Sequence, residues 1–300
     1  MKKALFAIAI LWISVAAVAQ EHMEHQMPPA TTTAAPVPPM QAGQPWAKQA
    51  LEASPRHREW VNIKSGDRTV SAFVVYPEVK KKATSVVVIH EIFGMSDWVQ
   101  MLTDELAAAG SLAIAPDLLS GMGPNGGGTS SFADGQAVGK AIRDLPPDQI
   151  TADLNAVADY VSKLPAANGK VAVAGFCWGG TETFRFATNR PSLAAAFVFY
   201  GSSPESPEAI AAIKAPVYGF YAGNDARIGA TVPKTQELMA AAKKKYEVVT
   251  YEGAGHGFMR AGDAPPPPAD ADEKTREAYA ANKKARDAAW ARWKERLKKL

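Results

Sequence analysis

The chain has a single cysteine, Cys177, among its 300 residues. One cysteine cannot form an intramolecular disulfide, and it cannot build a four-cysteine zinc site. The excess of basic over acidic side chains is also small, 33 against 30, so composition does not indicate a nucleic-acid-binding protein. A hydrophobic fraction of 47% and a charged fraction of 21% are ordinary globular values. They exclude a disordered or collagen-like chain.

The first residues also lack a hydrophobic run long enough to cross a bilayer, which takes about 20 residues. Lys2 and Lys3 precede an apolar stretch over residues 4–18, and Ala17-Val18-Ala19 has the small-x-small pattern of a cleavage site. This arrangement predicts a secretory signal peptide over residues 1–19. The alternative is an uncleaved membrane anchor. We expect an exported protein without a membrane span after cleavage, in the periplasm or secreted.

The rest of the chain divides into a linker and one domain. Residues 20–55 are rich in proline and predict a disordered linker, with little fixed structure up to about Trp46. From residue 56 to 300, strand-like apolar runs alternate with helical segments. The alternation predicts one α/β domain with a doubly wound, mostly parallel sheet and helices on both faces. The closing segment from about Asp272 carries Trp290 and Trp293 at helical spacing. It predicts a helix packed on the sheet, with a membrane-surface helix as the alternative.

The most informative segment surrounds the cysteine. A strand over residues 171–174 leads into Gly175-x-Cys177-x-Gly179 and then a helix. A nucleophile between a strand and a helix sits on a tight turn, and small neighbours at positions minus two and plus two avoid collisions. The start of the helix favours a thiolate. A buried structural cysteine would explain the same pattern, so the motif needs partners.

Two partners follow in the order that such sites use. Asp225 comes after the strand 217–221, and His256 lies in a glycine-rich loop after the strand 247–251. Both are expected at the C-terminal edge of the sheet, where ligands bind in such folds. Nucleophile, acid and histidine occur in the chain order of α/β-hydrolases. Taken singly, Asp225 could be a turn residue and His256 a surface histidine.

Five motifs together resemble the dienelactone hydrolase (carboxymethylenebutenolidase) family of the α/β-hydrolase fold. They occur in the family's order over about residue 60 to the end of the sequence. They are His90-Glu91-Ile92-Phe93-Gly94, Ala115-Pro116-Asp117-Leu118, the turn 175–180, Gly223-x-Asp225 and Ala254-Gly255-His256-x-Phe258.

The resemblance implies roles for seven residues. Cys177, His256 and Asp225 would form a catalytic triad, and Glu91 would contact the resting thiol and help to activate it. The backbone N–H groups of Ile92 and Trp178 would form the oxyanion hole. Arg260 would bind a substrate carboxylate, since a guanidinium can bond both oxygens, although it could also be a surface arginine.

The sequence departs from the family pattern after Asp117, where a second substrate arginine is expected. That stretch is a glycine-rich segment over residues 120–129, Arg143 does not align with it, and we expect a flexible loop there. Its Gly-x-Gly-x-x-Gly match at residues 121–126 does not indicate a dinucleotide site, because Pro124 interrupts it and no clear helix start follows. The true substrate therefore need not be dienelactone.

The sequence thus predicts a monomeric hydrolase of a small lactone or carboxylic ester that uses neither a cofactor nor a metal. Two alternatives remain. One is a carboxylesterase or thioesterase of other specificity that uses the same site. The other is a non-enzymatic protein that binds ligands or senses redox state through its thiol.

Overall fold

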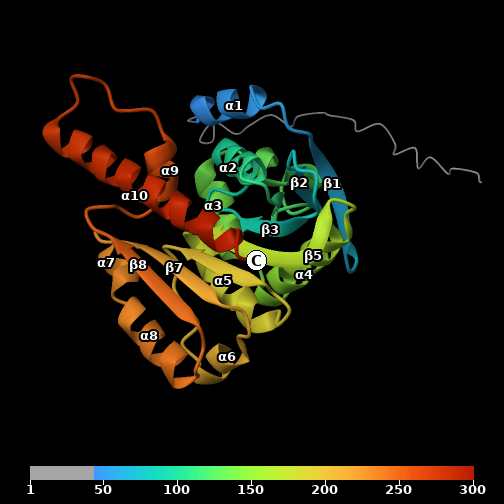
Figure 1. Ribbon diagram of the computed structural model, residues 1–300. Coiled ribbons are helices and arrows are strands. Elements are labelled where there is room, and N and C mark those ends of the chain that lie inside the picture. The colour runs from blue at the N-terminus through green and yellow to red at the C-terminus, as the bar shows by residue number, and fades with distance from the viewer. Residues whose placement is uncertain (1–43) are drawn as a thin grey trace, which may run out of the picture. The chain divides into compact units, whose positions relative to one another are not determined.

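The computed structural model describes residues 44–300 (Figure 1). The predicted signal peptide and the linker up to residue 43 lie outside the described residues. The strands are β1 (Arg58–Ser65), β2 (Arg68–Val75), β3 (Ala83–Ile89), β4 (Leu112–Pro116), β5 (Ala167–Phe176), β6 (Ala195–Phe199), β7 (Val217–Ala222) and β8 (Tyr246–Tyr251). The α-helices are α1 (Pro45–Glu52), α2 (Asp97–Ala108), α3 (Gly135–Arg143), α4 (Pro147–Lys163), α5 (Trp178–Asn189), α6 (Pro207–Ala212), α7 (Ala226–Gly229), α8 (Val232–Ala241), α9 (Phe258–Asp263) and α10 (Glu273–Leu297).

All eight strands form one sheet in the order β1-β2-β4-β3-β5-β6-β7-β8. A hairpin joins β1 to β2, and β2 pairs antiparallel with β4. Every other neighbouring pair is parallel. From β3 the chain passes to β4 on one side and later to β5 on the other, so the strand order reverses beside β3. Ligands in open α/β sheets bind at this reversal, beyond the carboxyl ends of the strands.

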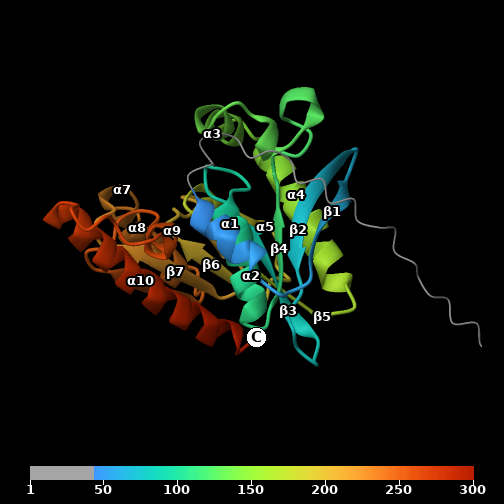
Figure 2. The same ribbon diagram turned by 90° about the horizontal axis from the view of Figure 1, so that it is seen from above.

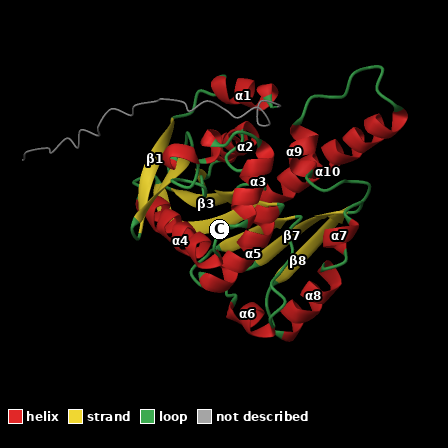
Figure 3. Ribbon diagram, turned by 180° about the vertical axis from the view of Figure 1, so that it is seen from behind, coloured by secondary structure: helices red, strands yellow, loops and turns green. Residues whose placement is uncertain are grey.

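Helices cover both faces of the sheet, which confirms the predicted doubly wound architecture (Figure 3). β3 is buried on both faces: Val87 and Ile89 belong to one buried cluster, and Val86 and Val88 belong to the other. A strand that alternates between two dry faces must be apolar throughout. One cluster takes side chains from α3, α4, α5, α6 and α8, and the other from α1, α2, α9 and α10.

The long helix α10 crosses the second face as predicted (Figure 2). Asp272 caps its start by accepting the N–H of Thr275 at 2.7 Å. Ala289, Trp293 and Leu297 are buried at intervals of four residues, and Trp290 packs beside them. Within the described residues, no helix is both long enough and apolar enough to cross a membrane.

Helix α1 lies inside the stretch predicted as a disordered linker. Pro45 occupies its first turn, a position that proline favours because the missing N–H would have no partner there. Ala47 is buried in the second core cluster. The proline-rich composition concealed this helix, and the ordered chain begins before residue 56.

Candidate active site

The turn at Cys177 has the strained geometry that the glycine pattern predicts. Cys177 has φ 56° and ψ −117°, in a region that side-chain-bearing residues rarely occupy. A Cβ at Gly175 would lie 2.1 Å from the carbonyl oxygen of Gly179. A Cβ at Gly179 would lie 2.3 Å from the carbonyl oxygen of His90. Only glycine fits at either position, so the turn can bring α5 close beneath the thiol.

Asp225 and His256 form a hydrogen-bonded pair. His256 Nδ1 lies 2.5 Å from Asp225 Oδ2, and the other oxygen of Asp225 accepts the N–H of Ile228 at 3.3 Å, at the start of α7. Asp225 is buried, whereas the His256 side chain is 31% exposed. With Nδ1 engaged by the carboxylate, Nε2 is the ring nitrogen left for another partner.

The Cys177 thiol lies beside the ring. The pKa of His256 is raised to about 9: the interaction with this thiol is the main cause, burial opposes it, and Asp225 adds to the rise. Imidazolium is therefore the prevailing form of His256 at neutral pH. An imidazolium beside a thiol at a helix N-terminus favours the thiolate. The structure thus brings together the three residues predicted as a triad.

Glu91 forms a buried cluster with Arg260 and Tyr200. Arg260 Nε donates to Glu91 Oε2 at 2.7 Å, and the Tyr200 hydroxyl donates to Oε1 at 3.3 Å. The Glu91 side chain is 3% exposed and that of Arg260 is 32% exposed. The expected contact between Glu91 and the resting thiol stays a prediction. The two carboxylate oxygens of Glu91 accept from Arg260 and Tyr200, and a charged guanidinium is a strong partner for a buried carboxylate.

Tyr200 is a site residue that sequence reasoning did not find. It follows β6, is fully buried and has a positive φ of 41°. Its ring lies edge-on to His256 at 5.0 Å between centroids. Burial, and next the charge of Glu91, raise the pKa of its hydroxyl, so it stays a donor. The sequence signal that could have identified Tyr200 is a tyrosine that follows a buried strand and precedes a glycine.

The two predicted oxyanion donors come from two different segments of the chain. Ile92 follows Glu91 in the turn after β3, and Trp178 is the first residue of α5. The N–H groups of a helix's first turn have no acceptor inside the helix, which leaves that of Trp178 available. The side chain of Ile92 packs towards α3, where a Cβ at Gly139 would lie 3.6 Å from Ile92 Cγ1 and 3.5 Å from Arg143 Nη1. Arg143 thus lies near Ile92, on a helix that the sequence did not reveal.

The glycine-rich segment after Asp117, which the sequence predicts as a flexible loop, is held at its last residue, Thr129. Thr129 donates its N–H to Asp117 Oδ2 and its hydroxyl to Oδ1, each at 2.7 Å. The Thr129 hydroxyl oxygen also accepts the N–H of Met95 at 3.2 Å. These bonds tie the segment to the end of β4 and to the turn that carries Ile92.

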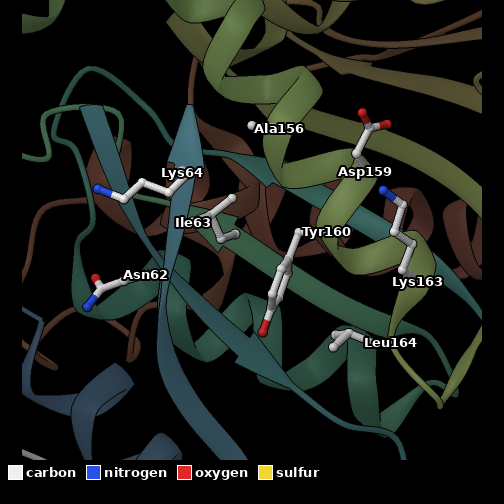
Figure 4. A pocket seen from close by; sticks show the side chains of 8 residues that line it. All are labelled: Asn62, Ile63, Lys64, Ala156, Asp159, Tyr160, Lys163 and Leu164. Carbon is white, nitrogen blue, oxygen red and sulfur yellow. The ribbon is translucent and has the colours of Figure 1, made fainter. Parts of the chain in front are cut away.

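The structure also has a depression away from this site. A depression of about 630 Å³ lies between β1 and α4, and none of the predicted site residues lines it (Figure 4). Its lining residues are Asn62, Ile63, Lys64, Ala156, Asp159, Tyr160, Lys163 and Leu164. Among residues 44–300, no group of three or more His, Cys, Asp or Glu side chains is arranged to hold a metal.

Comparison with known proteins points the same way as the geometry. The family model described as "Dienelactone hydrolase family" matches residues 70–300. A "Putative carboxymethylenebutenolidase" of Salmonella typhi is 35% identical over 66% of this chain and 76% of its own length. A protein of the same name from Saccharolobus solfataricus is 30% identical over 77% of this chain and 94% of its own. The crystal structure of a "Putative Dienelactone Hydrolase" from Klebsiella pneumoniae superposes with a TM-score of 0.67 at 26% identity. That superposition covers 82% of this chain and 100% of the other.

Proposed function

Since the chain belongs to the dienelactone hydrolase family, we propose that it cleaves a lactone or carboxylic ester through an acyl intermediate on Cys177. One observation carries the proposal: His256 Nδ1 lies 2.5 Å from the carboxylate of Asp225, and the Cys177 thiol is near enough to the same ring to be the main cause of its raised pKa. A nucleophile, a proton carrier and an orienting acid in this sequence of contacts define nucleophilic acyl transfer.

The reaction runs in two halves. The Cys177 thiolate attacks the carbonyl carbon, and the carbonyl π electrons move to the oxygen, which the N–H groups of Ile92 and Trp178 stabilise. When the C–O bond breaks, His256 Nε2 gives its proton to the departing alkoxide, leaving a thioester on Cys177. Water then attacks the thioester while His256 takes its proton, and collapse releases the acid and the thiolate.

The Glu91 cluster points to the kind of substrate. Arg260 uses Nε to bind Glu91, and one third of its side chain is exposed. We assign the remaining guanidinium N–H groups to a carboxylate on the substrate, because a guanidinium fork matches a carboxylate. With the carboxylate of Glu91 compensated by Arg260, a second anion can approach the same guanidinium at reduced repulsion. The proposed substrate is a small lactone or ester that bears a carboxylate.

The direct test is capture of the acyl group. Full-chain protein mixed with an activated aryl ester is expected to gain the mass of the acyl group on the peptide that contains Cys177. Cys177→Ala should abolish both the adduct and turnover, and Cys177→Ser should turn over far more slowly, since a hydroxyl is harder to ionise. Hydrolysis that survives Cys177→Ala would refute the mechanism.

The same experiment separates the alternatives left by the sequence. Comparing lactones, aryl esters and thioesters, each with and without a carboxylate, ranks the substrate classes. A protein that only binds ligands or senses redox state would give no turnover with any of them.

We also propose that residues 1–19 direct export and are removed, since a basic start, an apolar run and a small-x-small site occur in the order that signal peptidase reads. Expression of the full chain in a Gram-negative host should yield periplasmic protein whose N-terminus is Gln20. An intact N-terminus in the cytoplasmic fraction would contradict export.

A further inference from the structure

His90 is a buried histidine that the proposed mechanism does not use. Its side chain is fully buried at the end of β3, and its Nδ1 lies 2.8 Å from the carbonyl oxygen of Glu91. A carbonyl oxygen can only accept, so Nδ1 carries the proton and Nε2 is a bare acceptor. Among residues 44–300, no group donates to that Nε2. A buried acceptor without a donor is costly, and such an exception asks for a functional reason.

The charge state of His90 follows from its surroundings. Burial lowers the pKa of His90, and the nearby carboxylate of Asp117 only partly opposes this. Both oxygens of Asp117 are engaged by Thr129, and one of them also by the N–H of Leu119. His90 is therefore a neutral ring with one fixed donor.

The Nδ1–H of His90 sets the direction of the Ile92 N–H, one of the two proposed oxyanion donors. The carbonyl oxygen of Glu91 accepts from His90 Nδ1 and, at 3.1 Å, from the N–H of Gly94. The peptide bond that bears this carbonyl also bears the N–H of Ile92. In a planar trans peptide the two groups point in opposite directions. Fixing the carbonyl of Glu91 towards His90 therefore aims the N–H of Ile92 the other way.

The ring of His90 also contacts the second oxyanion residue. It stacks on the indole of Trp178 with centroids 5.5 Å apart and an interplanar angle of 14°. The backbone fits as closely, because a Cβ at Gly179 would collide with the carbonyl oxygen of His90. His90 thus lies between the peptide of Ile92 and the first turn of α5.

We propose that His90 is a positioning residue that sets the oxyanion hole, holding the Ile92 N–H by a hydrogen bond to the Glu91 carbonyl and the Trp178 turn by stacking. The inference rests on the proposed acyl-transfer function and deepens it. His90 touches no reacting atom. Its two contacts make the direction of both oxyanion donors depend on one neutral ring.

Two variants separate the contacts. His90→Phe keeps a flat ring against Trp178 but has no donor, and His90→Asn keeps an N–H near Nδ1 but has no ring. The readout is the single-turnover acylation rate of Cys177 by an aryl ester, divided by its alkylation rate with iodoacetamide. Alkylation needs the thiolate and His256 but forms no oxyanion, so a general loss of structure would slow both reactions.

We expect His90→Phe to lower this ratio about 10-fold or more, since outright removal of one oxyanion donor costs about 10²–10³-fold. His90→Asn should lower it less, by about 3-fold. The matched control is His57→Phe, because His57 is an exposed histidine whose ring also lies against an aromatic residue, Tyr76. Its ratio should stay at the wild-type value.

The result that overturns the inference is a ratio unchanged in both His90 variants, or acylation and alkylation that fall in parallel. If His90→Phe does not fold, as judged by its thermal melt, His90→Asn alone decides by the same criterion. Failure of the proposed function is distinguishable, since it would already show in the wild-type protein as the absence of an acyl adduct on Cys177.

Discussion

Two histidines at the carboxyl ends of the strands show how the partners of a side chain determine its chemistry. His256 interacts with the Cys177 thiol and the Asp225 carboxylate, is partly exposed, and has its pKa raised to about 9. His90 is bonded to a peptide carbonyl, is fully buried, and has its pKa lowered by burial. Imidazole titrates near neutral pH, so modest differences in surroundings decide whether it carries a proton. One residue type thus provides a protonated ring beside the thiol and a neutral ring with a fixed N–H donor.

Sheet position explains why the surroundings differ. His90 directly follows β3, which has a neighbouring strand on each side and helices over both faces. His256 follows β8, the last strand of the sheet, whose residues are only partly buried or exposed. An edge position leaves solvent and substrate access to the ring, whereas a central position removes both.

The largest expected effect comes from removing the titrating histidine. His256→Ala should lower kcat roughly 10⁵-fold, because loss of a triad base removes proton transfer in both halves of the reaction. His90→Phe should cost only a small part of that. Steady-state hydrolysis of one aryl ester by both variants makes the comparison. Losses of similar size would show that the two histidines do not have distinct roles.

Changing the carboxylate partner should move His256 towards the behaviour of an ordinary histidine. Asp225→Asn should lower kcat about 10³-fold, since an amide can hold the wrong tautomer of His256. In the wild type, kcat/KM should fall as pH rises through about 9, where His256 loses the proton it gives to the leaving group. Asp225 raises this pKa, so in Asp225→Asn the fall should begin at lower pH. A pH profile whose descending limb does not move would contradict the assignment.

A smaller effect is expected at Glu91, which connects the two histidines. Its carbonyl faces His90, and its carboxylate binds Arg260 four residues after His256. Arg260→Met leaves that buried carboxylate uncompensated and should destabilise the fold by about 1–3 kcal/mol, reduced from a fully buried pair by the exposure of Arg260.

Urea unfolding measures the loss. Glu91→Gln combined with Arg260→Met should recover part of it, because a neutral amide needs no compensating charge. The control Arg227→Met, at an exposed position beside Asp225, should change stability by less than about 0.5 kcal/mol. An equal loss in both single variants would mean that the Glu91 pair contributes no specific stability.

The features that could be predicted from sequence are those in which a residue type is forced by backbone geometry. Gly175 and Gly179 predict the turn at Cys177, because a side chain at either position would collide with backbone atoms. The continuous apolar run of β3 predicts a strand that is buried on both faces. The order Cys177, Asp225, His256 follows from the order of strand ends along the chain, so this candidate triad could be predicted without knowledge of the fold.

The features that could not be predicted depend on partners distant in sequence or on dihedral angles. Nothing in the sequence around Glu91 shows that its carboxylate pairs with Arg260, 169 residues away. The positive φ of Tyr200 leaves no trace in residue type. Helix α3 is short and contains Gly135 and Gly139, which lower helical propensity, and it is held by packing of Val138 and Ile142.

Helix α10 holds in place the segment that follows His256. Asp263, at the end of α9, accepts the indole N–H of Trp98 at 2.8 Å and pairs with Arg286 of α10. The helix that begins just after His256 is thereby clamped between α2 and α10. Cys177 precedes Asp225, His256 and Arg286 in the chain, so it is synthesised before all of them. If His256 activates the thiol as proposed, that activation has to wait until the C-terminal helix has been made and has docked.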